Sequence, residues 1–470
     1  MACLLDLPEE VLIVLGQYLG GPDLLQLSQV CSRLWRVFHN DYVWRRVLAL
    51  ENYQNHKAFH KLAASVAPLP CVEKLNYILH TRVRRRWQKG QFTPTCLPLS
   101  ERIKYGNNER YLVRITRKQA DSWTAQVFDI SGPGLRPLIT QQLEMALKTD
   151  FLLQLNSILV AKHTALLCFS GEGNDAPQEL IAFDLLDKFK ELWRESISDW
   201  GHLKLPTLFG DGVYKLNLLT DKIEIYDVRT FKLHHSIPLV EEMRYPQGEI
   251  SGDGKHLVIP GHITASNAPI ISVWNIRTSV QRFLQADRVF CPFRWFEKTA
   301  VKQDRVYALL NRRSMFIWDA NSGACLSEVS LSNARPGEKN PGFLFLGVSK
   351  SLVATIHDSN SSVGIFDAMG GLRTVLEPCH PHFSPSECEI CDVTFTEHVL
   401  VVRFLVMKQP MYHVALYPLS LGSESILLDS PAPILFPLQT AEALFLPNLA
   451  TTPTKLLHFA GQSLRILDFM

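Results

Sequence analysis

The stretch FIWDANSG, Phe316 to Gly323, shows in its shortest form the pattern that decides the fold. A run of β-forming residues ends in Trp318 and Asp319, and turn-forming residues follow. Aspartate suits the end of a strand because its carboxylate can accept a hydrogen bond from the backbone N–H two residues later, which sets the turn. We therefore interpret the stretch as a strand end and a turn, with the tryptophan packed between neighbouring sheets.

The same pattern occurs seven more times, in the segments AQVFDI, LIAFDL, IEIYDV, SVWNIR, VGIFDA, VALYPL and RILDF. The residues at the aspartate position are Asp129, Asp184, Asp227, Asn275, Asp319, Asp367, Pro418 and Asp468. They follow one another at intervals of 43 to 55 residues. A repeat of this length with several strands per unit is typical of a β-propeller. The sequence predicts an all-β propeller over residues 91–470 with eight blades; seven is the alternative, because the last two segments depart from the pattern.

The two ends of the repeat region predict how the ring closes. The chain stops two residues after Asp468, so the last sheet has three strands and needs a fourth. A candidate strand at Phe92–Leu99 lies just before the first repeat. Pairing this strand with the last one would leave no exposed sheet edge at the junction.

These units resemble WD repeats. The best-formed one is GEISGDGKHLVI, Gly248 to Ile259, in which an inner strand, an Asp-Gly-Lys turn and a second strand follow one another. Most units lack the Gly-His dipeptide of the family, and Trp318-Asp319 is the one true Trp-Asp pair. The resemblance implies an upper face, built from the turns between second and third strands, where partners bind.

The amino-terminal stretch from Leu4 to Leu48 reads LLDLPEEVLIVLGQYLGGPDLLQLSQVCSRLWRVFHNDYVWRRVL. Leu7-Pro8-Glu9-Glu10 is a helix start, since proline and acidic residues both suit the first turn. The helix that follows is apolar around most of its circumference, and two short helices come after it. About 45 residues rarely bury enough surface to fold alone, so the excess apolar surface predicts a protein partner.

This stretch resembles the F-box. The matching positions are Leu7-Pro8, Glu10, Asp23-Leu24-Leu25, Leu27 to Cys31, Trp35, and Asp41 to Trp44. The resemblance implies docking on the Skp-type adaptor of a cullin-based ubiquitin ligase. The residues expected to form either the interface or the core are Leu7, Pro8, Val11, Leu12, Leu15, Leu24, Val30 and Trp35.

Residues 49–90 between the two modules are expected to form a helical linker. Pro68 and Pro70 break it, and apolar residues recur at helical spacing from Val72 to Trp87. Its end is strongly basic, with Arg82, Arg84, Arg85, Arg86 and Lys89, and runs into a Trp-x-x-Gly found also in F-box proteins with WD repeats. The basic run is either a nuclear import signal or the charged face of a linker helix, and we expect the second. The fold class is thus α+β and multidomain: an F-box at 1–48, the linker, and the propeller.

Composition limits the partners. Lys and Arg total 48 against 46 acidic residues, which argues against a dedicated nucleic-acid binder. No apolar run reaches the roughly 18 residues of a membrane span, and the acidic N-terminus does not suit a signal peptide. Ten dispersed cysteines fit a reducing compartment. We therefore expect a cytoplasmic or nuclear protein with neither nucleic acid nor a membrane as partner.

Basic residues on the upper face suggest how a substrate is bound. They are Arg117, Lys222, Arg312, Arg313 and Lys408. F-box proteins with WD repeats recognise short, often phosphorylated, segments with upper-face arginines, and the planar guanidinium suits phosphate. Arg312 and Arg313 are the best candidates; the alternative is that they are solvated turn residues.

A second cluster comprises Cys379, His380, His382, Cys388 and Cys391. Two such ligand pairs can bind zinc, but free cysteines are also among the most buried residues, and we expect no metal site. The sequence contains no phosphate loop, G-x-S-x-G or H-E-x-x-H, so we expect neither catalysis nor a cofactor. The resemblance implies a non-catalytic substrate receptor, with the adaptor and through it a cullin at one end and a protein substrate at the other; the alternative is an interaction scaffold without ligase function.

Overall fold

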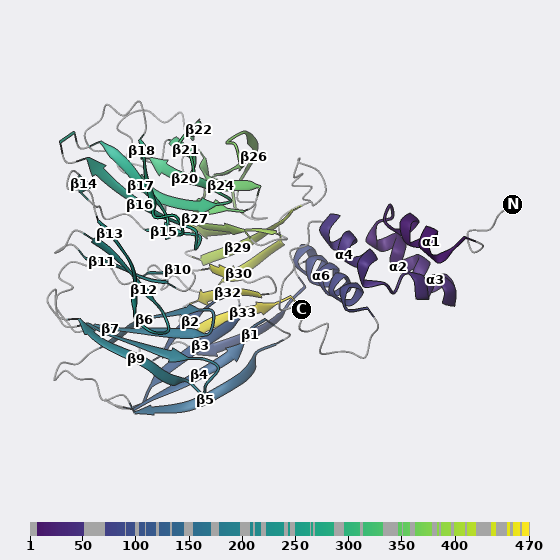
Figure 1. Ribbon diagram of the computed structural model, residues 1–470, viewed down its shortest axis with the longest axis horizontal. Helices are drawn as coiled ribbons and strands as arrows, with labels where there is room; N and C mark the ends of the chain where they lie inside the picture. Colours follow the sequence, from purple (N-terminus) through teal and green to yellow (C-terminus); the bar gives the residue numbers. More distant parts are fainter. Residues whose placement is uncertain are drawn as a thin grey trace.

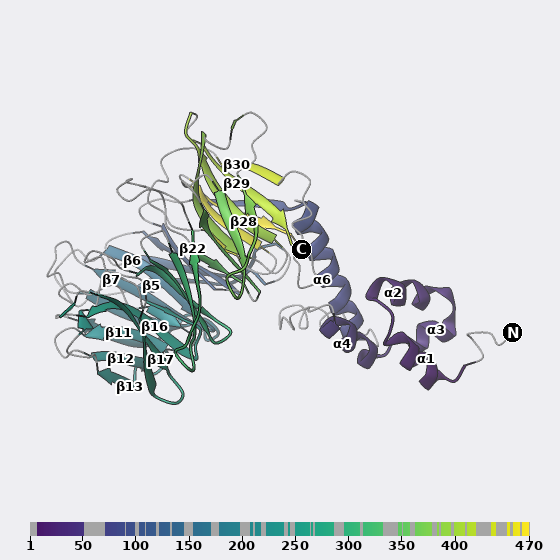
Figure 2. The same ribbon diagram turned by 90° about the horizontal axis from the view of Figure 1, so that it is seen from above.

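The computed structural model describes residues 7–50 and 71–89 and, from residue 91 to residue 469, the strands and many of the turns between them. A small group of helices lies at one end of the molecule and a ring of sheets at the other (Figure 1). One long helix runs between the two parts, as the second view shows (Figure 2).

Among the described residues, the helical module contains the short helices α1 (Glu9–Gly16), α2 (Gly21–Val30), α3 (Ser32–Val37) and α4 (Asp41–Leu50), and α6 (Val72–Lys89) leads from it to the ring. Pro8 is the N-cap of α1, and two glutamates occupy its first turn, where they suit the helix dipole. Gly20 is the N-cap of α2, and Pro22 and Asp23 lie in its first turn, where proline and an acidic residue are both favoured. The sulfur of Cys31 accepts a hydrogen bond from the backbone N–H of Leu34 at the start of α3.

The core of the helical module lies between its helices and the first half of α6. Its buried side chains include those of Leu12, Leu24, Phe38, Trp44 and Tyr77. Trp44 Nε1 donates a hydrogen bond of 2.7 Å to the carbonyl of Phe38, so its one polar group is satisfied in the core. The module therefore uses a helix of the linker to complete its core.

The strands form eight antiparallel sheets, the blades. Blade 1 contains β2 (Ile103–Asn107), β3 (Tyr111–Arg117), β4 (Ser122–Asp129) and β5 (Arg136–Glu144). Blade 2 contains β6 (Gln154–Ala161), β7 (Thr164–Ser170), β8 (Gln178–Asp184) and β9 (Lys190–Ile197). Blade 3 contains β10 (Thr207–Phe209), β11 (Gly212–Asn217), β12 (Lys222–Asp227) and β13 (Leu233–Pro238). Blade 4 contains β14 (Met243–Arg244), β15 (Ser251–Gly252), β16 (His256–Ile263), β17 (Pro269–Asn275) and β18 (Val280–Gln285).

The second half of the chain continues the series. Blade 5 contains β19 (Phe296–Lys302), β20 (Arg305–Leu310), β21 (Ser314–Asp319) and β22 (Cys325–Ser330). Blade 6 contains β23 (Leu346–Val348), β24 (Leu352–His357), β25 (Ser362–Asp367) and β26 (Leu372–Leu376). Blade 7 contains β27 (Cys388–Phe395), β28 (Val399–Val406), β29 (Met411–Pro418) and β30 (Ile434–Leu438). Blade 8 contains β31 (Leu449–Thr451), β32 (Lys455–Ala460), β33 (Ser463–Asp468) and β1 (Thr93–Pro98).

The blades close into a ring. Each neighbouring pair shares a hydrophobic cluster, and the cluster of Leu112, Ile130, Leu457, Leu464 and Ile466 joins blade 8 to blade 1. The fold is an eight-bladed β-propeller, which confirms the predicted blade number and the all-β class of this part.

The repeated aspartate position marks the end of the third strand in every blade. Its side-chain oxygen accepts a hydrogen bond from the backbone N–H two residues later in six blades, for example Asn321 N to Asp319 Oδ1 at 3.1 Å. The aromatic residue before it packs between blades, as Trp318 does in the cluster that joins blades 4 and 5. Both predictions from the repeat are confirmed.

The ring closes as predicted from the chain ends. β1 pairs with β33 in an antiparallel register that places Thr93 opposite Asp468 and Pro98 opposite Ser463. α6 therefore meets the propeller on the lower face, where the third strands end, and the turns between second and third strands lie on the opposite, upper face.

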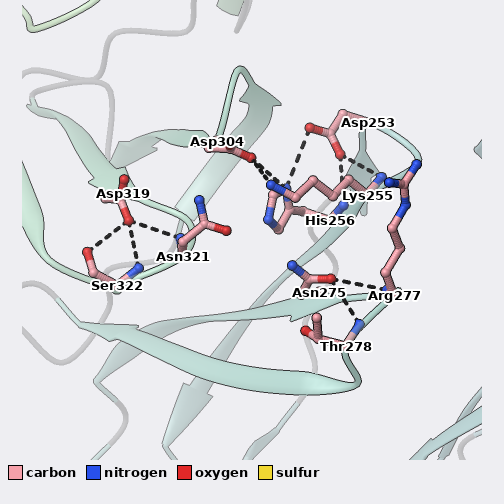
Figure 3. A network of polar contacts seen from close by, with 10 residues as sticks. All are labelled: Asp253, Lys255, His256, Asn275, Arg277, Thr278, Asp304, Asp319, Asn321 and Ser322. Atoms are coloured by element: carbon pink, nitrogen blue, oxygen red, sulfur yellow. Dashed lines mark hydrogen bonds and ion pairs between the residues drawn. The ribbon is translucent and has the colours of Figure 1, made fainter.

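Polar contacts join neighbouring blades on the lower face (Figure 3). Lys255, from the turn before β16, forms an ion pair of 2.5 Å with Asp304 in the corresponding turn of blade 5. His256 is fully buried beside this pair, with Nδ1 at 3.6 Å from a carboxylate oxygen of Asp253 and 3.8 Å from one of Asp304. These contacts fix the relative position of two blades without lying on the upper face.

Candidate functional site

A row of apolar side chains on α1 faces away from the core of the helical module. Val11, Val14 and Leu15 lie on one face of α1, and Tyr18 in the turn after the helix continues their i, i+3, i+4, i+7 spacing; the exposed fractions lie between 40% and 79%. The opposite face of the same helix is packed: Leu12 is 1% exposed. The described residues leave this apolar row uncovered, as is typical of a surface that binds another protein.

The structure divides the eight predicted interface-or-core residues between the two roles. Leu12 and Leu24 belong to the core. Leu7 packs against the core at its edge, and Pro8 is exposed at the start of α1. The exposed apolar members are Val11, Leu15, Val30 and Trp35. The predicted set omitted Val14 and Tyr18, although their helical spacing from Val11 was visible in the sequence.

Trp35 has a defined orientation although it is 45% exposed. Its ring lies against that of His39, with the centroids 3.9 Å apart, and His39 Nδ1 lies 2.8 Å from the carbonyl oxygen of Trp35. Burial lowers the pKa of His39, and the positive charge of Lys74 acts in the same direction. The imidazole is therefore mainly neutral at neutral pH and supports the indole as an apolar platform.

Three of the predicted substrate-binding residues lie on the upper face, in three different blades. Arg117 ends β3, Lys222 begins β12, and Lys408 lies in the turn between β28 and β29. The guanidinium of Arg117 lies over the Trp123 ring, 5.4 Å from its centroid. Lys408 forms an ion pair with Glu387, whose pKa is lowered chiefly by this hydrogen bond.

Arg312 and Arg313 lie outside the described residues. Their role in substrate binding stays a prediction, as do those of the three basic residues that the structure places on the upper face.

The two cysteines of the predicted C-x-x-C do not converge. Cys388 belongs to the cluster between blades 6 and 7, and Cys391 to the cluster between blade 7, blade 8 and α6. Burial raises the pKa of Cys388 to about 11 and that of Cys391 to about 12, so both thiols are protonated at neutral pH. Cys379, His380 and His382 lie outside the described residues.

No group of three or more His, Cys, Asp or Glu side chains among the described residues is arranged to hold a metal ion. No described helix is long and apolar enough to cross a membrane.

Residues 4–49 match the family model of the F-box-like domain. Over 43 residues the chain is 51% identical to F-box only protein 31 of Rattus norvegicus and 46% identical to that of Homo sapiens. The match covers 9% of this chain and about 8% of the length of these relatives. The amino-terminal module is therefore an F-box-like domain, and its exposed apolar row lies within the matched segment.

Solved structures resemble the propeller only distantly. BamB from Moraxella catarrhalis aligns with 80% of this chain and 99% of its own, at 12% identity and a TM-score of 0.47. The computationally designed Ika8 protein aligns with 79% of this chain and 98% of its own, at 11% identity and a TM-score of 0.45.

Proposed function

We propose that this chain, with its F-box-like domain and eight-bladed propeller, is the substrate-recognition subunit of an SCF-type ubiquitin ligase. The observation that carries the proposal is the exposed apolar row of α1 beside Trp35, within the segment that matches the F-box-like model. In this role the row docks on a Skp-type adaptor, which binds a cullin. Burying such a row stabilises the complex by roughly 25 cal/mol for each Å² of apolar surface removed from water.

The arrangement of the two parts suits a receptor that transfers no group itself. α6 contributes Tyr77 to the core of the helical module and Trp87 to a cluster with blades 7 and 8. A helix anchored at both ends holds the two parts at a fixed separation. A substrate on the upper face would then lie at a defined distance from the ubiquitin-transfer machinery, and the resulting proximity is the mechanism.

The substrate is proposed to bind on the upper face, which points away from the attachment of α6. Lys222 is exposed there and forms no ion pair with the described residues, whereas Arg117 and Lys408 already contact neighbours. A phosphorylated or acidic segment would supply the missing counter-charge.

The alternative function is an interaction scaffold that meets the adaptor without ligase activity. It shares the docking row and the propeller, and differs in the fate of the bound target. Accumulation of the target after depletion of this protein would support the receptor.

The proposal is tested with purified adaptor and cullin and the full chain carrying Trp35→Ala. Because the indole is partly exposed, the helical module should stay folded, while truncation of a central aromatic contact typically costs 2 kcal/mol or more of binding, a loss of about 30-fold. Tyr42→Ala is the matched control, since Tyr42 is an exposed aromatic residue on α4 outside the predicted set. If wild-type protein does not retain the adaptor, or if both variants retain it equally well, the F-box is not the docking surface.

A further inference from the structure

The second half of α6 carries a stripe of positive charge that the proposed function does not use. The stripe consists of Arg82, Arg85, Arg86 and Lys89. Successive residues of an α-helix are rotated by about 100°, so these four side chains fall within an arc of about 100°. The apolar residues that anchor α6 to the ring, Val83 and Trp87, lie on another side of the helix. The stripe is therefore turned away from the packed face.

Three described cations elsewhere in this end of the molecule have partners. Arg45 forms an ion pair with Glu73 at 3.1 Å, Arg33 donates to the carbonyl of Leu7 at 2.7 Å, and Lys74 donates to Ser28 Oγ at 2.9 Å. Within the stripe, Arg86 Nε donates a hydrogen bond of 3.2 Å to the carbonyl of Gln91. The four side chains form no ion pair with a carboxylate of the described residues. The sequence offers none nearby either, because no Asp or Glu occurs between Glu73 and Glu101.

Helix stability alone does not account for the stripe. Cations suit the last turn of a helix, which explains Arg86 and Lys89 but not Arg82 and Arg85, which lie earlier. Arg82 repels Arg85 and Arg86, and Lys89 repels both as well, since like charges three and four residues apart are destabilising. A solvated helix face is usually built from alternating charges instead.

We infer that the stripe is a docking site for an acidic segment of a protein partner. Charge complementarity sets the chemistry: four cations on one helix face with no carboxylate of their own match a run of Asp or Glu side chains. The distance from Arg82 to Lys89 along the axis is about 10 Å, which suits a few residues of an extended peptide and is short for a nucleic-acid duplex. The stripe lies on α6, the helix that completes the core of the helical module (Figure 2). A protein bound to the helical module could therefore reach the stripe with an acidic segment.

The test uses the full chain and a fluorescent peptide of ten glutamates as the probe. The triple variant R82Q/R85Q/K89Q removes three charges of the stripe. The control R136Q/R277Q/K232Q removes the same charges from exposed positions of the propeller. Fluorescence anisotropy should show the stripe variant binding at least about tenfold more weakly, the control binding like wild type, and wild-type affinity falling as salt rises. Thermal unfolding followed by circular dichroism checks that both variants are folded.

Three outcomes would overturn the inference. Wild type does not bind the peptide, or wild type and both variants bind it equally well, or the stripe variant and the control variant lose the same amount of affinity. A ten-nucleotide RNA serves as the competing probe. Binding of the RNA but not of the glutamate peptide through the same residues would assign the stripe to nucleic acid instead.

Discussion

Lys455 and Asp468 form a buried ion pair at the junction where the ring closes. Lys455 Nζ lies 3.2 Å from Asp468 Oδ1, and both side chains are almost fully buried. The other carboxylate oxygen of Asp468 accepts a hydrogen bond from the backbone N–H of Gly134, in the neighbouring blade. Burial lowers the pKa of Lys455, and the charge of Asp468 opposes this shift. The pair therefore satisfies two charges that would each be costly alone.

Removing one partner of this pair should be worse than removing the charge of both. Lys455→Met leaves the buried carboxylate of Asp468 without its cation, which we expect to cost about 3–5 kcal/mol of unfolding free energy. The double variant Lys455→Met/Asp468→Asn keeps an acceptor for Gly134 and should recover most of the loss. Urea denaturation measures both values; equal losses in the single and double variants would show that the charge is not the cause.

His39 should make the stability of the chain depend on pH. Its pKa in the folded state lies below the ordinary value of 6.5, so the unfolded chain binds the proton more readily. Stability then rises with pH between the two pKa values and is lost as pH falls from 6.5 through the folded pKa. Other histidines titrate in the same range, so the measurement is the difference between wild type and His39→Gln in urea denaturation at several pH values. A difference that does not change with pH contradicts this assignment.

The residue scale also shows why the sequence could not separate interface from core. Val11 and Leu12 are neighbours in a helix start that is apolar on all sides, yet one is 40% exposed and the other 1%. The choice is made by residues distant in sequence, since Phe38 and Tyr77 fill the core on the side of Leu12. The need for glycine at position 16 is likewise visible only in the fold, because a Cβ there would lie 2.7 Å from the Phe38 ring.

At the scale of elements the sequence was more informative, because the turn after each third strand is a local device. An aspartate or asparagine side chain binds the backbone two residues on whatever the rest of the fold does, so its position predicts a strand end. Pro418 ends β29 without that contact, and the regular spacing located it all the same. The first strand of blade 4 is harder to predict from the sequence, because β14 and β15 are separate two-residue strands that both pair with β16. Such short strands are set by their partner and leave little periodicity to detect.

β1 is expected to be essential for the ring, since it supplies the outer strand of blade 8. Deleting residues 90–100 would expose the edge of β33 and remove the strand pairing that joins the two ends of the propeller. We expect the propeller to unfold, or at least a clearly lower melting temperature measured by calorimetry. An unchanged melting temperature would contradict this prediction, because blade 8 would then be stable with three strands.

At the scale of the whole molecule, Trp87 is the contact through which the helical module is oriented on the ring. Its indole is fully buried and stacks on Phe469, with the ring centroids 3.7 Å apart and the planes 9° from parallel. α6 continues without interruption from this contact to Tyr77 in the other core. The orientation of the two parts therefore depends on few side chains, although each part has a core of its own.

Trp87→Ala should loosen the two parts while leaving both folded. Truncating a buried tryptophan typically costs about 3–5 kcal/mol, and here the loss falls on the joint between the parts. We expect a broader distance distribution between one dye on the helical module and one on the propeller, measured by single-molecule energy transfer. Ile78→Ala on the exposed side of α6 is the control and should leave the distribution unchanged.

Under the proposed function, Trp87→Ala should bind adaptor and substrate as wild type does but support slower ubiquitin transfer, because proximity acts through a fixed geometry. A variant with a broader distribution and an unchanged transfer rate would show that a rigid α6 is not required for the mechanism.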